Sequence, residues 1–179
     1  MSKIILVTGG ARSGKSSYAL ELAESLAQRK LFVATCPELD TEMEDRVSRH
    51  KKEREGRGWV TIESEIDLAS VFTTQAREYD VVLVDCITLW VNNILYIHEQ
   101  KSAVIDDSTI AELCAAWLQQ ASHLDATVIL VTNEVGLGVV PDNALARKYR
   151  DLVGTCNQLI GKQADEVTLV SCGLPLNIK

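Results

Sequence analysis

The chain has 179 residues, a formal net charge of −7 and a hydrophobic content of 46%. This length and composition suit a sizeable buried core, so we expect residues 1–179 to form a single domain. The negative charge argues against general affinity for nucleic acid or an acidic membrane, because both need a surplus of positive charge. No run approaches the roughly 18 consecutive apolar residues of a membrane span. We therefore expect neither nucleic acid nor a membrane as a partner.

The N-terminal sequence and the cysteines both favour a cytoplasmic location. The apolar run at residues 4–7 is too short for a signal peptide and has no small-residue cleavage site after it. The five cysteines are irregularly spaced, which fits reduced thiols better than disulfides or a metal site. Cys86 and Cys172 lie in apolar, strand-like sequence, where we expect both to be small core residues.

Short apolar runs rich in β-branched residues alternate with stretches long enough for a helix. The runs cover residues 4–7, 31–34, 81–84, 127–132 and 166–170. They are apolar at consecutive positions, as expected for strands covered by helices on both faces. This alternation predicts an α/β fold with a mainly parallel sheet.

The intervening stretches return apolar residues every three or four positions and are rich in Ala, Leu, Glu and Lys, which predicts helices. These helices are expected at residues 15–29, 42–54, 67–79, 89–98, 108–124 and 143–162. The charged segment 42–57 and the polar segment 99–108 are not rich in Pro or Ser, so we interpret them as surface excursions rather than domain linkers.

A Gly-x-x-x-x-Gly-Lys-Ser pattern lies between the first apolar run and the first helical stretch, which are the flanks that a phosphate-binding P-loop requires. Glycines let the backbone approach a ligand, so that successive N–H groups point at phosphate oxygens. Lys15 is expected to neutralise the β- and γ-phosphates, and the Ser16 hydroxyl to ligate Mg²⁺. The predicted phosphate-binding residues are Gly9, Gly10, Ala11, Arg12, Ser13, Gly14, Lys15 and Ser16.

Asp85 directly follows the apolar run at residues 81–84. Open α/β sheets bind ligands at the carboxyl ends of their strands. Taken alone, such an aspartate is more often a turn or cap residue, but beside a P-loop we expect it to hold Mg²⁺ directly or through water. Together these features predict a P-loop NTPase fold of the RecA-like type.

His50 lies in a basic segment, and helical spacing would place it on one face with Arg46 and Arg54. Met43 and Val47 would form an adjoining apolar stripe. A neutral imidazole nitrogen can attack phosphorus, and flanking arginines would stabilise the charge that grows on the oxygens. The alternative is a solvated charged helix with an incidental histidine, and spacing alone favours that alternative.

Several segments together resemble a known family. They are the string from Val7 to Ser16, then Val33-Ala34-Thr35, then Arg46-Val47-x-x-His50-x-x-x-Arg54, then Asp85-Cys86-Ile87-Thr88, and the stretch from Val131 to Pro141. The chain is similar, nearly end to end, to the bifunctional adenosylcobinamide kinase and adenosylcobinamide-phosphate guanylyltransferase family of cobalamin biosynthesis. Many proteins share the phosphate loop, but the full Gly-Gly-Ala-Arg-Ser-Gly-Lys-Ser string and the Asn-Glu-Val-Gly segment are more specific.

The resemblance implies two reactions. The first phosphorylates the aminopropanol hydroxyl of adenosylcobinamide with ATP or GTP. The second transfers GMP from GTP to adenosylcobinamide phosphate through a histidine–GMP intermediate, which the family pattern places on His50, and gives adenosylcobinamide-GDP and pyrophosphate. The resemblance also implies a homo-oligomer, expected as a trimer. Further nucleotide-binding residues implied by it are Ala34, Thr35, Cys36, Lys51, Lys52, Glu53, Arg54, Glu63 and Asp85.

Other interpretations remain open at this stage. The chain could be a general small-molecule P-loop kinase in which His50 is a bystander, or a non-enzymatic nucleotide-dependent switch. The glycine-rich stretch at residues 133–141 fits an active-site loop and a plain strand-to-helix connection equally well. The residues that contact guanine and the corrinoid cannot be placed from the sequence.

Overall fold

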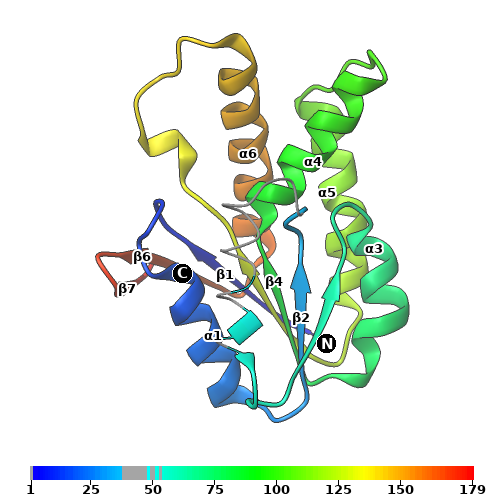
Figure 1. Ribbon diagram of the computed structural model, residues 1–179, viewed down its shortest axis with the longest axis vertical. Coiled ribbons are helices and arrows are strands. Elements are labelled where there is room, and N and C mark those ends of the chain that lie inside the picture. The colour runs from blue at the N-terminus through cyan, green and yellow to red at the C-terminus, as the bar shows by residue number, and fades with distance from the viewer. Residues whose placement is uncertain (1, 38–47, 49–50, 53) are drawn as a thin grey trace.

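The sheet has seven strands in the order β3-β2-β4-β5-β1-β6-β7 in the computed structural model, which describes residues 2–37, 48, 51–52 and 54–179 (Figure 1). All neighbouring strands pair in parallel except β6 and β7, which are antiparallel. The strands are β1 (Lys3–Thr8), β2 (Lys30–Ala34), β3 (Trp59–Glu63), β4 (Val81–Asp85), β5 (Thr127–Val131), β6 (Glu166–Ser171) and β7 (Leu174–Asn177). The predicted mainly parallel α/β fold is confirmed.

The apolar runs of the sequence became β1, β2, β4, β5 and β6, whereas β3 and β7 were not predicted. β3 is an edge strand that contains no buried residue, and all of β7 is exposed. Neither strand therefore needs the continuous apolar run that marks a strand covered on both faces. Cys172 lies exposed in the turn between β6 and β7, so its prediction as a core residue was wrong.

Helices follow the strands much as the sequence predicts, with one exception. The helices are α1 (Lys15–Leu26), α4 (Ile87–Gln100), α5 (Asp107–Ser122) and α6 (Ala144–Gln163). The stretch predicted as one helix at residues 67–79 is α-helical only in α3 (Leu68–Ser70), and continues as a π-helix over Val71–Gln75 and a 3₁₀ turn over Ala76–Glu78. The hydroxyls of Thr73 and Thr74 donate to the Ser70 carbonyl, which competes with regular helix bonding.

Of the helix predicted at residues 42–54, the structure describes only Ser48, Lys51, Lys52 and Arg54, and each of these is helical. His50 and Glu53 lie outside the described residues.

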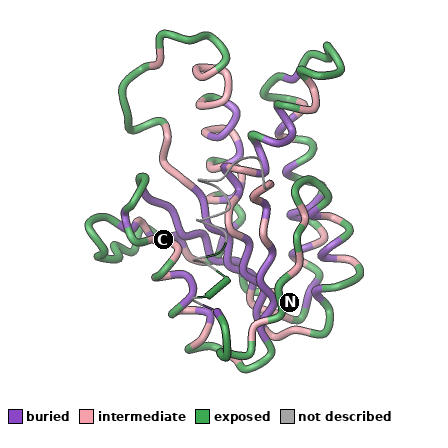
Figure 2. Tube along the Cα trace, viewed as in Figure 1, coloured by how far each residue is buried: buried purple, intermediate pink, exposed green. Residues whose placement is uncertain are grey.

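Helices cover both faces of the sheet because alternate residues of each strand point in opposite directions. Ile5 and Val7 of β1 pack with the buried residues of α1, whereas Ile4 and Leu6 pack on the side of α3, α4, α5 and α6. Figure 2 shows that the strands between these layers are largely buried. In the described part of the chain, no helix is long and apolar enough to cross a membrane.

This topology brings the ends of three strands together. The carboxyl ends of parallel strands lie at the same edge of the sheet, and β5 separates β1 from β4. The phosphate loop follows β1, Asp85 ends β4, and Asn133 and Glu134 follow β5. Ligands bind at this edge in open α/β sheets, so the candidate site lies here.

Candidate active site

The loop at residues 9–14 joins β1 to α1 and ends at Gly14, which has a left-handed φ of 91° and caps the start of the helix. Gly9 lies so close to β6 that a Cβ atom added to it would be 2.4 Å from the Val170 carbonyl oxygen. No other residue type fits this position without moving the chain. The N-terminus of α1 thus presents backbone N–H groups at the edge of the sheet, where they can bind an anion.

The turn between β6 and β7 supports the phosphate loop from behind. The Gly173 amide donates a hydrogen bond of 2.8 Å to the Ser13 carbonyl, and the Cα of Gly173 lies 3.2 Å from where a Cβ on Gly14 would be. A hairpin that the sequence did not predict therefore holds the loop in place.

Lys15 and Ser16 lie in one pocket with Asp85. The Lys15 Nζ donates a hydrogen bond of 3.0 Å to the Gly10 carbonyl, so its ammonium group lies over the loop. The pocket is lined by Lys15, Ser16, Phe32, Ala34, Cys36, Lys51, Arg54, Asp85, Cys86, Thr88, Leu89, Asn133 and Tyr149. The phosphate-loop cation Lys15, the Ser16 hydroxyl and the Asp85 carboxylate therefore face the same space.

Basic residues from the segment next to His50 line the same pocket. The Arg54 guanidinium lies over the Phe32 ring, with its central carbon 3.6 Å from the ring centroid, and the residue is buried. Stacking of this kind holds an arginine in a fixed orientation. Lys51 forms an ion pair of 3.0 Å with Glu63, which ends β3. Positive charge is thus concentrated beside the phosphate loop in a chain that is negative overall.

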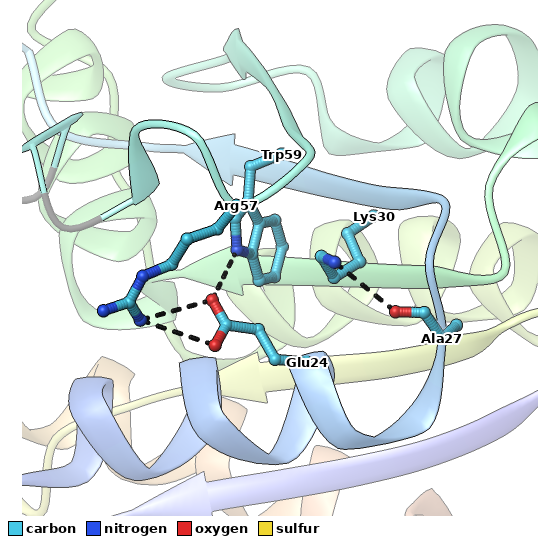
Figure 3. A network of polar contacts seen from close by, with 5 residues as sticks. All are labelled: Glu24, Ala27, Lys30, Arg57 and Trp59. Atoms are coloured by element: carbon cyan, nitrogen blue, oxygen red, sulfur yellow. Dashed lines mark hydrogen bonds and ion pairs between the residues drawn. The ribbon is translucent and has the colours of Figure 1, made fainter.

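The segment that follows these basic residues is attached to α1 (Figure 3). The indole Nε1 of Trp59 donates a hydrogen bond of 3.0 Å to Glu24 of α1, and Arg57 forms an ion pair of 3.4 Å with the same carboxylate. The Lys30 ammonium lies 5.8 Å from the centre of the Trp59 ring, and Lys30 is buried. Because α1 begins at Lys15, these contacts link the phosphate loop to the basic segment.

Glu134 lies beside the phosphate loop and is held by several hydrogen bonds. Its backbone N–H donates to the Gly9 carbonyl at 3.1 Å. Its carboxylate Oε1 accepts from the Thr8 hydroxyl at 2.9 Å and from the Asn157 amide at 3.2 Å. These bonds join the loop after β5 to the strand that carries the phosphate loop.

Asn157 of α6 also fixes the two residues that precede Glu134. Its Nδ2 donates to the Asn133 carbonyl at 3.1 Å, and its Oδ1 accepts from the Thr132 hydroxyl at 2.7 Å. Asn133, which lines the pocket, is therefore held in place by a helix that follows it in the chain. The place of Asn133 in the pocket favours the interpretation of residues 133–141 as an active-site loop, and Asn133 is the first residue of that stretch.

The β4 end of the pocket contains two groups that stay protonated. Burial, with a smaller contribution from the Asp85 charge, raises the pKa of the Cys86 thiol to about 11. Burial also raises the pKa of the Tyr149 phenol to about 12, and its hydroxyl donates to the Thr88 carbonyl at 3.2 Å. Both groups are therefore neutral near pH 7 and neither repels a phosphate.

Thr35 ties β2 to β4 at the same edge. Its hydroxyl accepts from the Cys86 amide at 2.7 Å and donates to the Cys86 carbonyl at 2.8 Å, and the residue is fully buried. The Thr35 hydroxyl therefore fixes the backbone next to Asp85.

The structure brings many of the predicted site residues together. Those that line the pocket are Lys15, Ser16, Ala34, Cys36, Lys51, Arg54 and Asp85. Lys52 lines a neighbouring surface hollow with Arg54 and Trp59, and Glu63 lies at the end of β3 in its ion pair with Lys51. The positions of His50 and Glu53 lie outside the described residues.

Sequence reasoning missed pocket residues that come from distant elements. They are Phe32, Cys86, Thr88, Leu89 and Tyr149. Asn133 also lines the pocket, and it begins the stretch at residues 133–141 for which the sequence left an active-site loop open. Tyr149 carries no local signal, since its approach to Thr88 depends on how α6 packs against α4.

A P-loop that shares its pocket with a strand-end carboxylate and a cluster of cations is the architecture of an enzyme that transfers phosphate-containing groups from nucleotides. Comparison with protein families narrows this class. The family model described as cobinamide kinase / cobinamide phosphate guanyltransferase matches residues 5–178. The chain belongs to this family, as its motifs indicated.

Curated relatives match over almost their full length. The bifunctional adenosylcobalamin biosynthesis protein CobU of Salmonella typhimurium is 40% identical over 182 residues, which cover 98% of this chain and 99% of the relative. The protein of the same name from Escherichia coli is 37% identical, with 98% and 99% covered. CobP of Pseudomonas aeruginosa is 36% identical, with 97% and 96% covered. The enzyme is therefore a bifunctional kinase and guanylyltransferase of cobalamin biosynthesis rather than a general small-molecule kinase or a non-enzymatic switch.

Proposed function

We propose that the enzyme phosphorylates adenosylcobinamide with ATP or GTP and then transfers GMP from GTP to the resulting phosphate through a covalent intermediate on His50. The observation that carries this proposal is that Lys51 and Arg54, which follow His50 closely in the sequence, line the same pocket as Lys15 and Asp85. A nucleophile carried by this segment would have a bound triphosphate within the same site.

In the kinase step, the aminopropanol hydroxyl oxygen attacks the γ-phosphorus of the donor. The bond from that phosphorus to the β-phosphate oxygen breaks, the nucleoside diphosphate leaves, and the hydroxyl proton passes to solvent. The loop amides and the Lys15 ammonium bind the β- and γ-phosphates and stabilise the charge on their oxygens. Holding donor and acceptor in one pocket supplies much of the rate enhancement.

In the guanylyl transfer, a neutral imidazole nitrogen of His50 attacks the α-phosphorus of GTP. The bond between that phosphorus and the bridging oxygen breaks, pyrophosphate leaves, and a phosphoramidate forms. A phosphate oxygen of adenosylcobinamide phosphate then attacks the same phosphorus, the P–N bond breaks, and free histidine is restored. Lys51 and Arg54 are suited to stabilise the negative charge in both displacements, while the phosphate loop holds the departing pyrophosphate.

The pocket fits a Mg²⁺ ion that arrives with the nucleotide. Ser16 and Asp85 offer the hard oxygen ligands that Mg²⁺ prefers, and phosphate oxygens and water would complete its coordination. The described residues contain no group of three or more His, Cys, Asp or Glu side chains that could hold a metal without the nucleotide. Bound Mg²⁺ would neutralise charge on the phosphates.

The remaining expectations of the resemblance belong to the same proposal. Ala34 and Cys36 line the pocket from the end of β2, where they are suited to contact the nucleotide. We also keep Thr35, Lys52, Glu53 and Glu63 as proposed nucleotide-binding residues. A homo-oligomer, expected as a trimer, and a cytoplasmic location remain part of the proposal. The free thiols of all five cysteines fit a reducing compartment.

Pyrophosphate exchange tests the histidine step without the corrinoid. Wild-type enzyme with GTP, Mg²⁺ and labelled pyrophosphate should move the label into GTP, because guanylylation of the enzyme is reversible. His50→Ala should abolish the exchange. His123 is an exposed histidine at the end of α5, so the control variant His123→Ala should retain the exchange. Exchange that survives in His50→Ala would show that another residue is the nucleophile.

A further inference from the structure

An open groove continues from the nucleotide pocket along α4 and α6. In Figure 1 both helices project beyond the carboxyl edge of the sheet. The groove between them has a volume of about 380 Å³. It is lined by Asn92, Leu95, Tyr96, Glu99, Asn143, Leu145, Ala146 and Tyr149. Tyr149 lines the nucleotide pocket as well, so the two spaces meet at this side chain.

The groove, and separately the loop that precedes α6 in the chain, expose large apolar side chains. Tyr96 is 58% exposed and Leu145 is 41% exposed, although both are in regular helices. Residues 136–140, which precede α6 in the chain, are all exposed, and Val139 is 94% exposed (Figure 2). Single exposed apolar residues need no explanation, but a group of them beside a pocket indicates a binding surface.

The nucleotide pocket and the groove differ in chemical character. The pocket contains the cations Lys15, Lys51 and Arg54, which suit phosphates. The groove contains aromatic and aliphatic side chains, the amides of Asn92 and Asn143, and one charged residue, Glu99. A ligand that spans both must have an anionic or hydroxyl end and a large, mostly uncharged end.

Cobinamide has this distribution of groups. Its corrin ring is a broad, flat macrocycle with apolar faces and amide side chains around its rim, and its aminopropanol arm carries the reactive hydroxyl. Aromatic and aliphatic side chains can pack on the faces of such a ring, and asparagine side chains can exchange hydrogen bonds with its amides. The arm can then reach the phosphates only at the end where the two spaces meet.

We propose that the groove between α4 and α6 binds the corrin ring of the acceptor, with Tyr96 and Leu145 against the ring and the aminopropanol arm passing Tyr149 toward Lys15. The inference rests on the proposed function. The same ring position serves both reactions, because the arm presents first a hydroxyl and then a phosphate to the one nucleotide pocket.

Equilibrium dialysis of the protein with cobinamide tests this site. The visible absorbance of the corrin ring measures how much cobinamide is bound. Tyr96→Ser combined with Leu145→Ser should raise the Kd for cobinamide about tenfold or more, because contact area with the ring is lost. Tyr96→Phe keeps the ring face and should bind within about twofold of wild type. Leu113→Ser, which removes a similarly exposed leucine from α5, should not change the affinity. The Kd for GTP, measured on the same preparations, reports whether each variant is folded.

Each outcome decides one claim. Unchanged cobinamide affinity in the double variant would overturn the groove assignment while leaving the proposed function intact. Dissociation of an oligomer by the same substitutions, seen by analytical ultracentrifugation, together with unchanged affinity per subunit, would identify this face as an interface between copies of the chain. If wild-type enzyme binds cobinamide in the groove but does not phosphorylate it with ATP or GTP, the proposed function fails and the groove assignment stands.

Discussion

The indole Nε1 of Trp59 donates a hydrogen bond of 3.0 Å to the Glu24 carboxylate, and so joins the segment that follows His50 to the helix that begins at the phosphate loop (Figure 3). Trp59→Phe removes this donor and keeps an aromatic ring beside Phe32, whose ring centroid lies 6.1 Å away. We expect the rate of enzyme guanylylation to fall about five- to tenfold, because a lost side-chain hydrogen bond in a half-buried setting costs about 1–1.4 kcal/mol.

The kinase step provides the control for this variant. It needs the phosphate loop but not the histidine, so phosphorylation of cobinamide by Trp59→Phe should change by less than about twofold. Quenched-flow measurement of labelled GMP incorporation, with a parallel steady-state kinase assay, separates the two steps. An equal loss of both rates would show that Trp59 supports the whole fold rather than the placement of the basic segment.

Neighbouring glycines of the phosphate loop should differ sharply in their tolerance of a side chain. A Cβ at Gly9 would lie 2.4 Å from the Val170 carbonyl oxygen and 2.7 Å from the Ser13 hydroxyl, whereas a Cβ at Gly10 has no neighbour within 4 Å in the described structure. Gly9→Ala should therefore lower the melting temperature and weaken GTP binding more than about tenfold, and Gly10→Ala should change the Kd less than about threefold. Equal effects in calorimetry and in GTP titration would contradict the loop geometry.

The Asn157 amide donates to the Glu134 carboxylate and thereby holds the loop after β5 against the phosphate loop. Asn157→Asp places a second carboxylate against Glu134, and like charges at this separation repel. We expect the Kd for GTP to rise about tenfold and the melting temperature to fall. Both should recover in part in the double variant Asn157→Asp/Glu134→Gln, because the carboxamide can donate to the new carboxylate, whereas the Asn133 carbonyl still lacks the amide donor of Asn157. Failure of the second substitution to restore either quantity would argue against a direct contact.

The thiol of Cys86 should react slowly with iodoacetamide. The thiolate is the reactive form, and burial raises the pKa of Cys86 to about 11, so the thiolate fraction is small at pH 8 and increases only as the pH approaches 11. Cys172, which is exposed in the turn between β6 and β7, should be alkylated first. Mass spectrometry of partially modified protein gives the order. If Cys86 is modified at the same rate as Cys172 at pH 8, the thiol of Cys86 is not in the buried environment that the structure gives it.

The features that the sequence predicted are local ones. Strands buried on both faces, such as β1 and β4, require continuous apolar runs, and the phosphate loop needs its glycines at fixed spacing. The edge strands β3 and β7 lack that requirement because they are largely exposed. Their contributions to the site, including Gly173 behind the phosphate loop, could therefore not be predicted.

The contacts that complete the site are long-range. Arg54 stacks on Phe32, and Asn157 reaches Glu134, across separations in the chain that no short motif spans. Such pairs depend on how the layers pack, which the periodicity of single segments does not determine. The role of His50 came from the family pattern and not from helical spacing, which favoured an incidental histidine.

Labelling of the enzyme by α-labelled GTP tests the central claim most directly. Wild-type enzyme with GTP and Mg²⁺, but without cobinamide, should acquire a protein-bound label that is released by acid and survives alkali, as expected for a phosphoramidate. His50→Ala should acquire none, and the label on wild-type enzyme should pass to cobinamide phosphate when that acceptor is added. Absence of label on wild-type enzyme, or equal labelling of His50→Ala, would contradict the covalent histidine mechanism.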